Sequence, residues 1–213
     1  MKNILKFPCV NSSISSDEIS ELFGLGPAHS QGSTVFKNIY ELKPAHYAIF
    51  NKSNFYINQY WKLESTLHID SFETTCSKIS FLLEDSIKRQ LSVSSPLCVP
   101  LSGGLDSSII VSYASKYLSQ LNTLSVDYVD NDKYFLKNDF QPNSDNYYID
   151  VMSKEFNTNH EYIVLDTPEL ADSLKDAMIA RGFPGMADID SSLLLFLRKI
   201  KEKYDIAISR RML

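Results

Sequence analysis

The chain has 213 residues, of which 44% are hydrophobic, and its 26 acidic side chains outnumber its 21 basic ones. This composition is typical of one or two globular domains that bury a hydrophobic core, and it argues against a largely disordered chain. The net charge of −5, without a long basic run, argues against a nucleic-acid-binding protein, so we expect no nucleic-acid partner.

The first part of the chain predicts a short helix and a β-hairpin. A capping-box pattern followed by the glycines at 24 and 26 predicts a helix over residues 15–23. Farther along, HYAIF and FYINQYW flank the polar residues NKSN. This pattern predicts an antiparallel hairpin over residues 46–61 with a four-residue turn.

After residue 64 the pattern changes from extended to helical, so we expect one domain over residues 1–64 and a second over residues 65–213. The second begins with apolar residues at helical spacing over residues 72–91. Short apolar strands then alternate with amphipathic helices. We expect strands at residues 96–101, 123–129, 161–165 and 204–209, and helices at residues 107–121, 144–156, 168–182 and 190–203. This order predicts an α/β fold with a parallel sheet covered by helices on both faces.

The stretch LSGGLDSS, residues 101–108, lies between the first of these strands and the helix that follows it. Ligands bind in open α/β sheets at the carboxyl ends of the strands, which is where this loop lies. Its glycines allow the backbone to approach an oxyanion closely, and the start of the helix presents free amides. The groups expected to hold a phosphate are the backbone of Gly103 and Gly104 and the hydroxyls of Ser102, Ser107 and Ser108.

The same stretch has an aspartate and no lysine, which excludes a Walker-type phosphate loop. A carboxylate beside phosphates would repel them unless a divalent metal lay between, so we expect Asp106 to bind Mg²⁺. The alternative is a serine-rich turn in which Asp106 only caps the following helix.

The three cysteines lack the CxxC spacing of a zinc site and do not form a disulfide framework, which suits a reducing compartment. The chain has no apolar run of signal-peptide or membrane-span length. We therefore expect a cytoplasmic protein without a membrane partner.

The string SGGLDSS resembles the pyrophosphate loop of the PP-loop ATP pyrophosphatases. Two further stretches, FGLGPAHSQGSTVFKNIYELKPAHYAIF with YINQYWKL and GFPGMADIDSSLLLFLRKIKE, resemble glutamine-hydrolysing asparagine synthetases. The resemblance runs from about Ile14 to Ile208 and follows the family's domain order.

This resemblance implies an ATP-dependent carbon–nitrogen ligase with two sites. An N-terminal glutaminase domain would release ammonia from glutamine, and the second domain would convert aspartate and ATP into a β-aspartyl adenylate that ammonia turns into asparagine, with release of AMP and pyrophosphate. Pyrophosphate and Mg²⁺ would lie at Ser102, Gly103, Gly104, Asp106, Ser107 and Ser108, and the adenine would lie at Leu101, Val126 and Asp127. The resemblance also suggests Asp145 as a second metal ligand, and an N-cap or a solvated turn is the alternative for that residue.

The sequence also departs from the family pattern. The family's glutaminase uses a cysteine exposed as the mature N-terminal residue, whereas residue 2 is Lys2, and the family's first domain is longer than residues 1–64. The family's second acidic glycine-rich loop would follow residue 209, where this sequence reads RRML. We therefore expect an incomplete, inactive portion of an asparagine synthetase that binds nucleotide weakly at most. Its unpaired hairpin should favour self-association.

Other functions remain open. Another PP-loop adenylating amidoligase would share the loop and differ in its substrate pocket, and a non-catalytic nucleotide-binding module would share the loop without turnover. A PP-loop tRNA-modifying enzyme is disfavoured by the negative net charge and by the scattered cysteines.

Overall fold

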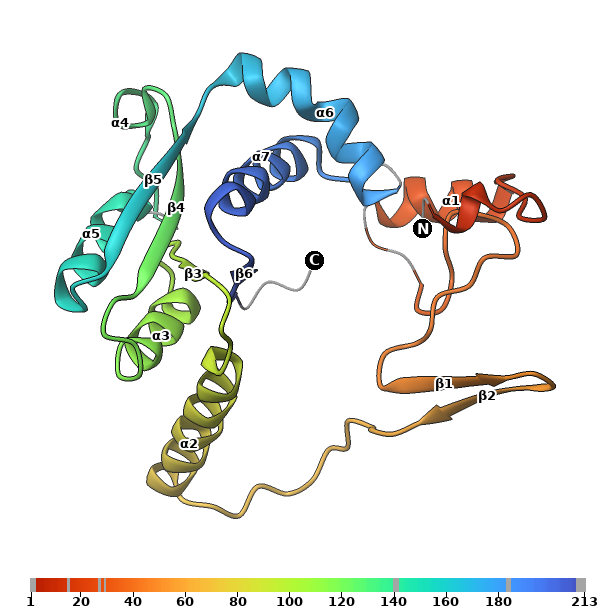
Figure 1. Cartoon of the computed structure of the whole chain (residues 1–213), viewed down its shortest axis with the longest axis horizontal. Helices are drawn as coiled ribbons and strands as arrows, with labels where there is room; N and C mark the ends of the chain where they lie inside the picture. Colours follow the sequence, from red (N-terminus) through yellow and green to blue (C-terminus); the bar gives the residue numbers. More distant parts are fainter. Residues whose placement is uncertain are drawn as a thin grey trace. The chain divides into compact units, whose positions relative to one another are not determined.

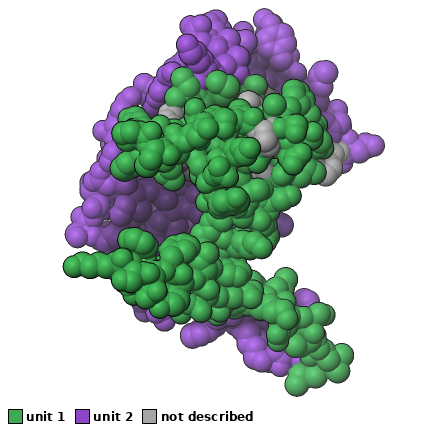
Figure 2. All heavy atoms as spheres, turned by 90° about the vertical axis from the view of Figure 1, so that its right-hand side faces the viewer, with its two compact units in different colours: residues 1–69, 178–187 green, residues 70–177, 188–213 purple. Residues whose placement is uncertain are grey.

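A computed structural model describes residues 3–14, 16–26, 28, 30–139, 142–182 and 185–209, with residue 188 described by its backbone only (Figure 1). The contacts divide the chain into two compact units, which Figure 2 colours separately. Unit 1 comprises residues 1–69 and 178–187, and unit 2 comprises residues 70–177 and 188–213.

Unit 1 begins with the short 3₁₀ helix η1 (Ile4–Lys6) and the helix α1 (Ser16–Leu25). The predicted start of α1 at residue 15 lies outside the described residues. Gly24 is part of the helix, and the chain leaves it at Gly26, whose φ of +64° lies in the left-handed region that glycine adopts without strain. The predicted end at residue 23 is therefore two residues too early.

The predicted hairpin forms from β1 (His46–Asn51) and β2 (Asn54–Gln59), which pair antiparallel. Its turn is shorter than the four residues expected, because Asn51 and Asn54 pair with each other and leave only Lys52 and Ser53 between the strands. The Asn51 side-chain oxygen stabilises this turn by accepting from the amides of Ser53 (3.2 Å) and Asn54 (3.0 Å).

Unit 2 begins with α2 (Phe72–Leu91), which confirms the predicted helix end for end. Ser71 is its N-cap and accepts from the amide of Thr74 at 3.2 Å. Only Ile87 and Leu91 of its apolar stripe are buried, whereas Phe72 is 78% exposed. Helical spacing therefore located this element correctly without showing how much of it is covered.

The core of unit 2 is a four-stranded parallel sheet in the order β5-β4-β3-β6. Its strands are β3 (Leu97–Pro100), β4 (Asn122–Tyr128), β5 (Asn159–Leu165) and β6 (Ile206–Ala207). The helices that follow α2 are α3 (Leu105–Ala114), α4 (Asn131–Tyr134), α5 (Asp145–Glu155), α6 (Thr167–Arg181) and α7 (Ala187–Lys203). The predicted α/β fold with a parallel sheet is thus confirmed. The small antiparallel hairpin of unit 1 precedes this sheet in the sequence.

Helices cover both faces of the sheet. Successive residues of a strand point to opposite faces, so each strand contributes side chains to two hydrophobic clusters. On one face, Val99 and Leu101 pack with residues of α2, α3 and α5, including Val111 and Ile149. On the other face, Cys98 and Leu124 pack with residues of α7, including Leu195, Phe196 and Ile200. In the part of the chain that the structure describes, no helix is both long and apolar enough to cross a membrane.

Candidate functional site

The glycine-rich stretch connects β3 to α3 and is anchored to the neighbouring strand β4. The Leu101 amide donates to the Leu124 carbonyl at 2.8 Å, which extends the ladder by one residue beyond β3. The Ser125 hydroxyl donates to the Leu101 carbonyl. Both backbone polar groups of Leu101 are therefore held by β4, so the loop leaves the sheet at a fixed point.

Gly103 needs to be glycine for two separate reasons. Its φ of +72° lies in the left-handed region, where a side chain is strained. A Cβ atom at this position would also lie 2.7 Å from the backbone oxygen of Asp145 and 3.2 Å from the Cβ of Tyr148, both in α5. Gly104 differs, because its φ is −76° and a Cβ there would meet only the Ser102 hydroxyl at 3.5 Å.

The loop serines stabilise one another. The Ser107 hydroxyl donates to the Gly104 carbonyl at 3.0 Å and accepts from the Ser102 amide at 3.2 Å. The Ser102 hydroxyl lies 3.1 Å from the same oxygen. These bonds fix the loop while the exposed Ser102 hydroxyl stays at the surface.

The start of α3 presents backbone donors rather than a side-chain cap. The helix begins at Leu105, two residues earlier than predicted, and its N-cap is Gly104, which has no side-chain capping bond. Helix N-terminal amides have no partner within the helix and carry the positive end of the dipole, so they favour an anion. Asp106 is the second residue of α3 and is not its N-cap.

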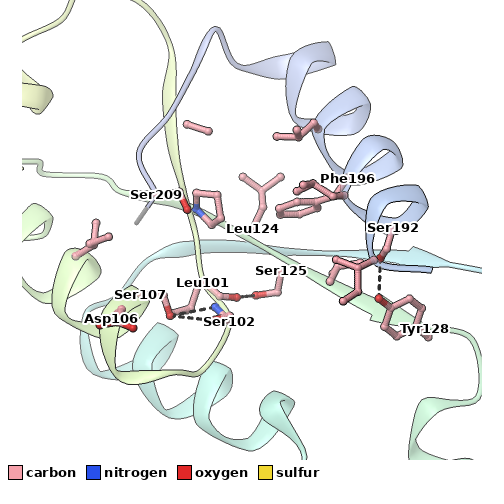
Figure 3. A pocket seen from close by; sticks show the side chains of 17 residues that line it. Leu101, Ser102, Asp106, Ser107, Leu124, Ser125, Tyr128, Ser192, Phe196 and Ser209 are labelled. Atoms are coloured by element: carbon pink, nitrogen blue, oxygen red, sulfur yellow. Dashed lines mark hydrogen bonds between the residues drawn. The ribbon is translucent and has the colours of Figure 1, made fainter. Parts of the chain in front are cut away.

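A cavity of about 660 Å³ lies beside this loop within unit 2 (Figure 3). Its floor includes Leu124 and Val126 of β4, and the facing wall comes from α7, with Leu193 and Phe196. Figure 3 shows the loop residues gathered at one end and the Tyr128–Ser192 pair at the other. The cavity is therefore polar near the loop and largely apolar between β4 and α7, which suits a ligand with an anionic part and a flat apolar part.

The structure brings some of the predicted site residues to this cavity and places others around it. Those that line it are Leu101, Ser102, Asp106, Ser107 and Val126. Gly103, Gly104 and Ser108 belong to the same loop and first helical turn but are not lining residues. Asp145 is exposed at the first position of α5, where its backbone rather than its carboxylate lies against Gly103.

Asp127 was expected to line the adenine pocket, and the structure places it elsewhere. It is not among the residues that line the cavity. Its carboxylate accepts from the Tyr128 amide (2.9 Å) and from the side-chain amides of Asn131 (2.8 Å) and Asn146 (2.9 Å). These donors direct Asp127 toward α4 and α5.

Sequence reasoning missed the wall that α7 provides. Helix α7 begins at Ala187 rather than at the predicted residue 190, and Ser192 on it is only 8% exposed and lies 2.6 Å from the Tyr128 phenol oxygen. Two signals were present in the sequence: a pair of serines opening an apolar helix, and Ser209 following the last strand. Ser209 also lines the cavity, as the rule about carboxyl ends of parallel strands would suggest.

No group of three or more His, Cys, Asp or Glu side chains that could hold a metal occurs among the described residues. A divalent cation at Asp106 would thus need most of its oxygen ligands from elsewhere. Phosphates and water commonly supply them to Mg²⁺, which binds proteins through one or two carboxylates. The donor set around the loop fits a metal that arrives with a phosphate ligand.

Comparison with known proteins gives a consistent result. The model of the asparagine synthase family matches residues 78–209. The chain is 41% identical over 214 aligned positions to asparagine synthetase [glutamine-hydrolyzing] 3 of Bacillus subtilis, covering 98% of this chain and 35% of that protein. It is 29% identical over 168 positions to a putative asparagine synthetase [glutamine-hydrolyzing] 2 of Methanocaldococcus jannaschii, covering 76% of this chain and 30% of that protein. The chain thus spans about a third of the length of these relatives.

Among solved structures, the NMN synthetase from Francisella tularensis aligns with a TM-score of 0.41 and 18% sequence identity. The alignment covers 67% of this chain and 56% of that chain.

Proposed function

This chain belongs to the asparagine synthase family, and from that premise we propose that unit 2 binds ATP with Mg²⁺ for the synthesis of asparagine from aspartate. The reaction proposed for the whole protein is an AMP-forming carbon–nitrogen ligation. Aspartate and ATP would give a β-aspartyl adenylate and pyrophosphate, and ammonia released from glutamine would then displace AMP.

The observation that carries this proposal is the loop between β3 and α3. It combines a left-handed Gly103, an N-terminal helical turn without a side-chain cap and a cavity of about 660 Å³ at its side. Hydrogen bonds to a charged group contribute about 1.5–3 kcal/mol each, so a few such donors can hold a pyrophosphate without a lysine. The proposed donors are the loop and first-turn amides and the hydroxyls of Ser102, Ser107 and Ser108.

The remaining parts of the nucleotide follow from the shape of the cavity. We assign the adenine to the apolar part between Val126 on the sheet side and Phe196 on α7, with Leu101 at its border with the loop, where a flat ring is shielded from water. We assign Mg²⁺ to Asp106, with Asp145 as a further ligand. When bound, the metal would offset the charge of the phosphates beside the Asp106 carboxylate.

The loop would also favour the chemical step. When the aspartate carboxylate attacks the α-phosphorus, negative charge develops on the departing pyrophosphate. Fixed backbone amides aimed at that charge stabilise it without reorganising, which is the usual source of electrostatic catalysis. The rigid attachment of Leu101 to β4 and the Ser102–Ser107 contacts keep these donors in place.

Residues 1–64 have a separate proposed origin. Their resemblance to the end of a glutamine amidotransferase domain supports assigning them to the glutaminase part of the same protein, with residues 65–213 as part of the synthetase domain. Glutamine or ammonia would then be a substrate of the whole protein alongside ATP and aspartate.

Calorimetric titration of the chain with ATP, with and without Mg²⁺, tests the proposal directly. Asp106→Ala should weaken Mg²⁺-dependent binding about 10-fold or more, since loss of one charged ligand contact costs about 1.5–3 kcal/mol. The control Asp172→Ala removes an exposed carboxylate from α6 that does not line the cavity, and it should leave the affinity unchanged. Absence of ATP binding, or equal effects of the two variants, would overturn the assignment.

Isotope exchange between ATP and pyrophosphate, measured on the full-length protein, separates the alternatives. Exchange that requires aspartate supports adenylation of that substrate. Exchange that requires a different carboxylic acid would point to another amidoligase, and binding without exchange would describe a nucleotide-binding module.

A further inference from the structure

The Asp127 carboxylate lies at the carboxyl end of β4 and binds three neutral amide donors. One oxygen accepts from the Tyr128 backbone amide at 2.9 Å and from Asn131 Nδ2 at 2.8 Å, and the other accepts from Asn146 Nδ2 at 2.9 Å. The side chain is half-buried and is not among the residues that line the cavity. Both oxygens of this carboxylate are already bonded to protein groups, so it holds the surrounding structure rather than the ligand.

The bond to Asn146 connects Asp127 to the first turn of α5, which begins at Asp145. The backbone oxygen of Asp145 lies where a Cβ of Gly103 would come within 2.7 Å. Gly103 is thus in van der Waals contact with the very turn that Asp127 holds. A second contact, from the Tyr162 phenol to Asp150 at 2.8 Å, fixes the following turn of the same helix.

The chemistry of the three donors explains why position 127 carries an acid. Two asparagine NH₂ groups and one backbone N–H converge on it, so only a group that accepts at both oxygens satisfies all of them. An asparagine at 127 would accept at one atom only, and its own NH₂ would meet the Asn146 side chain, which can turn over to present its oxygen. Removing both acceptors, as in Asp127→Ala, leaves Asn146 without this partner, and the start of α5 would lose its tie to β4.

We propose that Asp127 is a positioning residue for the pyrophosphate loop. By holding Asn146, it fixes the first turn of α5 against Gly103 and so keeps the loop in the left-handed conformation that directs its amides at the phosphates. The inference rests on the proposed function, because it assigns a role toward the phosphate part of the ATP that unit 2 is proposed to bind. It concerns the phosphates alone, because the turn of α5 that Asp127 holds lies against Gly103 of the loop and does not line the cavity.

A swap of the two side chains tests this role. Asp127→Ala removes both acceptors and should weaken ATP binding about 10-fold while leaving adenosine binding within about twofold, because the loop amides face the phosphates and not the nucleoside. Asn146→Asp places two carboxylates face to face and should weaken ATP binding in the same way. The double variant D127N/N146D restores a donor opposite an acceptor, and it should recover most of the lost affinity for ATP.

The measurement is calorimetric titration of the intact chain with ATP and with adenosine, both in the presence of Mg²⁺. Circular dichroism verifies that each variant is folded. If a single variant does not fold, Asn146→Ala takes its place, because it removes the donor without adding a charge. Equal losses for ATP and adenosine, unchanged ATP affinity in Asp127→Ala, or no recovery in the double variant relative to Asn146→Asp would each overturn the positioning role. If the unmodified chain does not bind ATP, the proposed function itself fails and the inference fails with it.

Discussion

The phenol oxygen of Tyr128 lies 2.6 Å from the hydroxyl oxygen of Ser192, and this hydrogen bond joins the end of β4 to the N-terminal part of α7. Both side chains line the cavity, at the end opposite the glycine-rich loop (Figure 3). Ser192 is only 8% exposed, so its hydroxyl has little access to water as a substitute partner. The pair therefore closes the apolar part of the cavity and holds α7 over the sheet.

Tyr128→Phe and Ser192→Ala should each lower the free energy of unfolding by about 1 kcal/mol, the typical net contribution of one hydrogen bond. The double variant should cost less than the sum of the two, because both single changes remove the same bond. Urea denaturation of the four proteins measures this coupling. The control Tyr147→Phe changes an exposed tyrosine that does not line the cavity, and strictly additive effects of the first pair would contradict the proposed link.

Gly103→Ala should destabilise the chain by about 1–3 kcal/mol, because it combines a left-handed φ with a Cβ 2.7 Å from the Asp145 oxygen. Gly104→Ala is the matched control in the same loop, with φ at −76° and ordinary contact distances. It should cost under about 1 kcal/mol, since alanine is only a weaker N-cap than glycine. Thermal or urea unfolding compares the two, and equal losses would show that the contact between the loop and α5 is not rigid.

His160 predicts a pH-dependent stability. Its Nδ1 lies 2.9 Å from the Thr123 hydroxyl, and within the described part of the structure its Nε2 is buried without a hydrogen-bond partner. Burial lowers the pKa of His160 below its usual 6.5, against an opposing effect of Asp150. The folded chain therefore keeps this imidazole neutral at pH values where the unfolded chain protonates it.

The sign of the effect follows from this difference. The contribution to stability is fully present above about pH 6.5 and is lost as the pH falls toward the lower folded-state pKa, by at most about 1.4 kcal/mol per pH unit for one proton. His160→Gln removes the titration, so its free energy of unfolding should fall less steeply between pH 7.5 and pH 5.5 than that of the unmodified chain. Parallel curves for the two proteins would contradict this explanation.

The hairpin of unit 1 predicts self-association. Phe50 and Phe55 pair directly across its strands and are 79% and 62% exposed, and Ile57 on the same face is 54% exposed. Exposed apolar faces of this kind associate with other surfaces, and two strands alone are only marginally stable. Sedimentation velocity should show a sedimentation coefficient that rises with concentration.

Phe50→Lys should reduce this association by placing a charge on the apolar face. Ser53→Lys adds the same charge in the turn, away from that face, and should leave the association unchanged. A chain that stays monomeric at every concentration, or equal effects of the two lysines, would count against the hairpin as the contact surface.

The sequence predicted the helices and strands better than the tertiary contacts around them. Helix α2 matched end for end, because helical spacing is a local property of the sequence. The last strand was predicted over residues 204–209 but pairs only at Ile206 and Ala207, because its length depends on how β3 lies beside it. Helix α3 starts at Leu105 because Gly104 serves as its N-cap, which no hydrophobic period reveals.

The candidate site was predictable where it follows a rule and not where it depends on tertiary contacts. The loop follows the carboxyl end of β3, so Ser102 and Asp106, which line the cavity, could be expected there in advance, whereas Leu101 and Val126 were implied by the family resemblance. The opposite wall on α7 and the turn of Asp127 toward Asn146 depend on how distant segments pack. Neither leaves a local pattern in the sequence.

The side chains of β4 alternate between the two faces of the sheet. Leu124 and Val126 pack toward α7, whereas Thr123 points to the face of α3 and α5 and bonds to His160. Deleting a single residue ahead of Leu124 would exchange these two sets. The buried polar side chains would then face the cavity, and Leu124 and Val126 would face α3 and α5. The lining of the cavity and the hydrophobic core of unit 2 thus both depend on the alternation of side chains along β4.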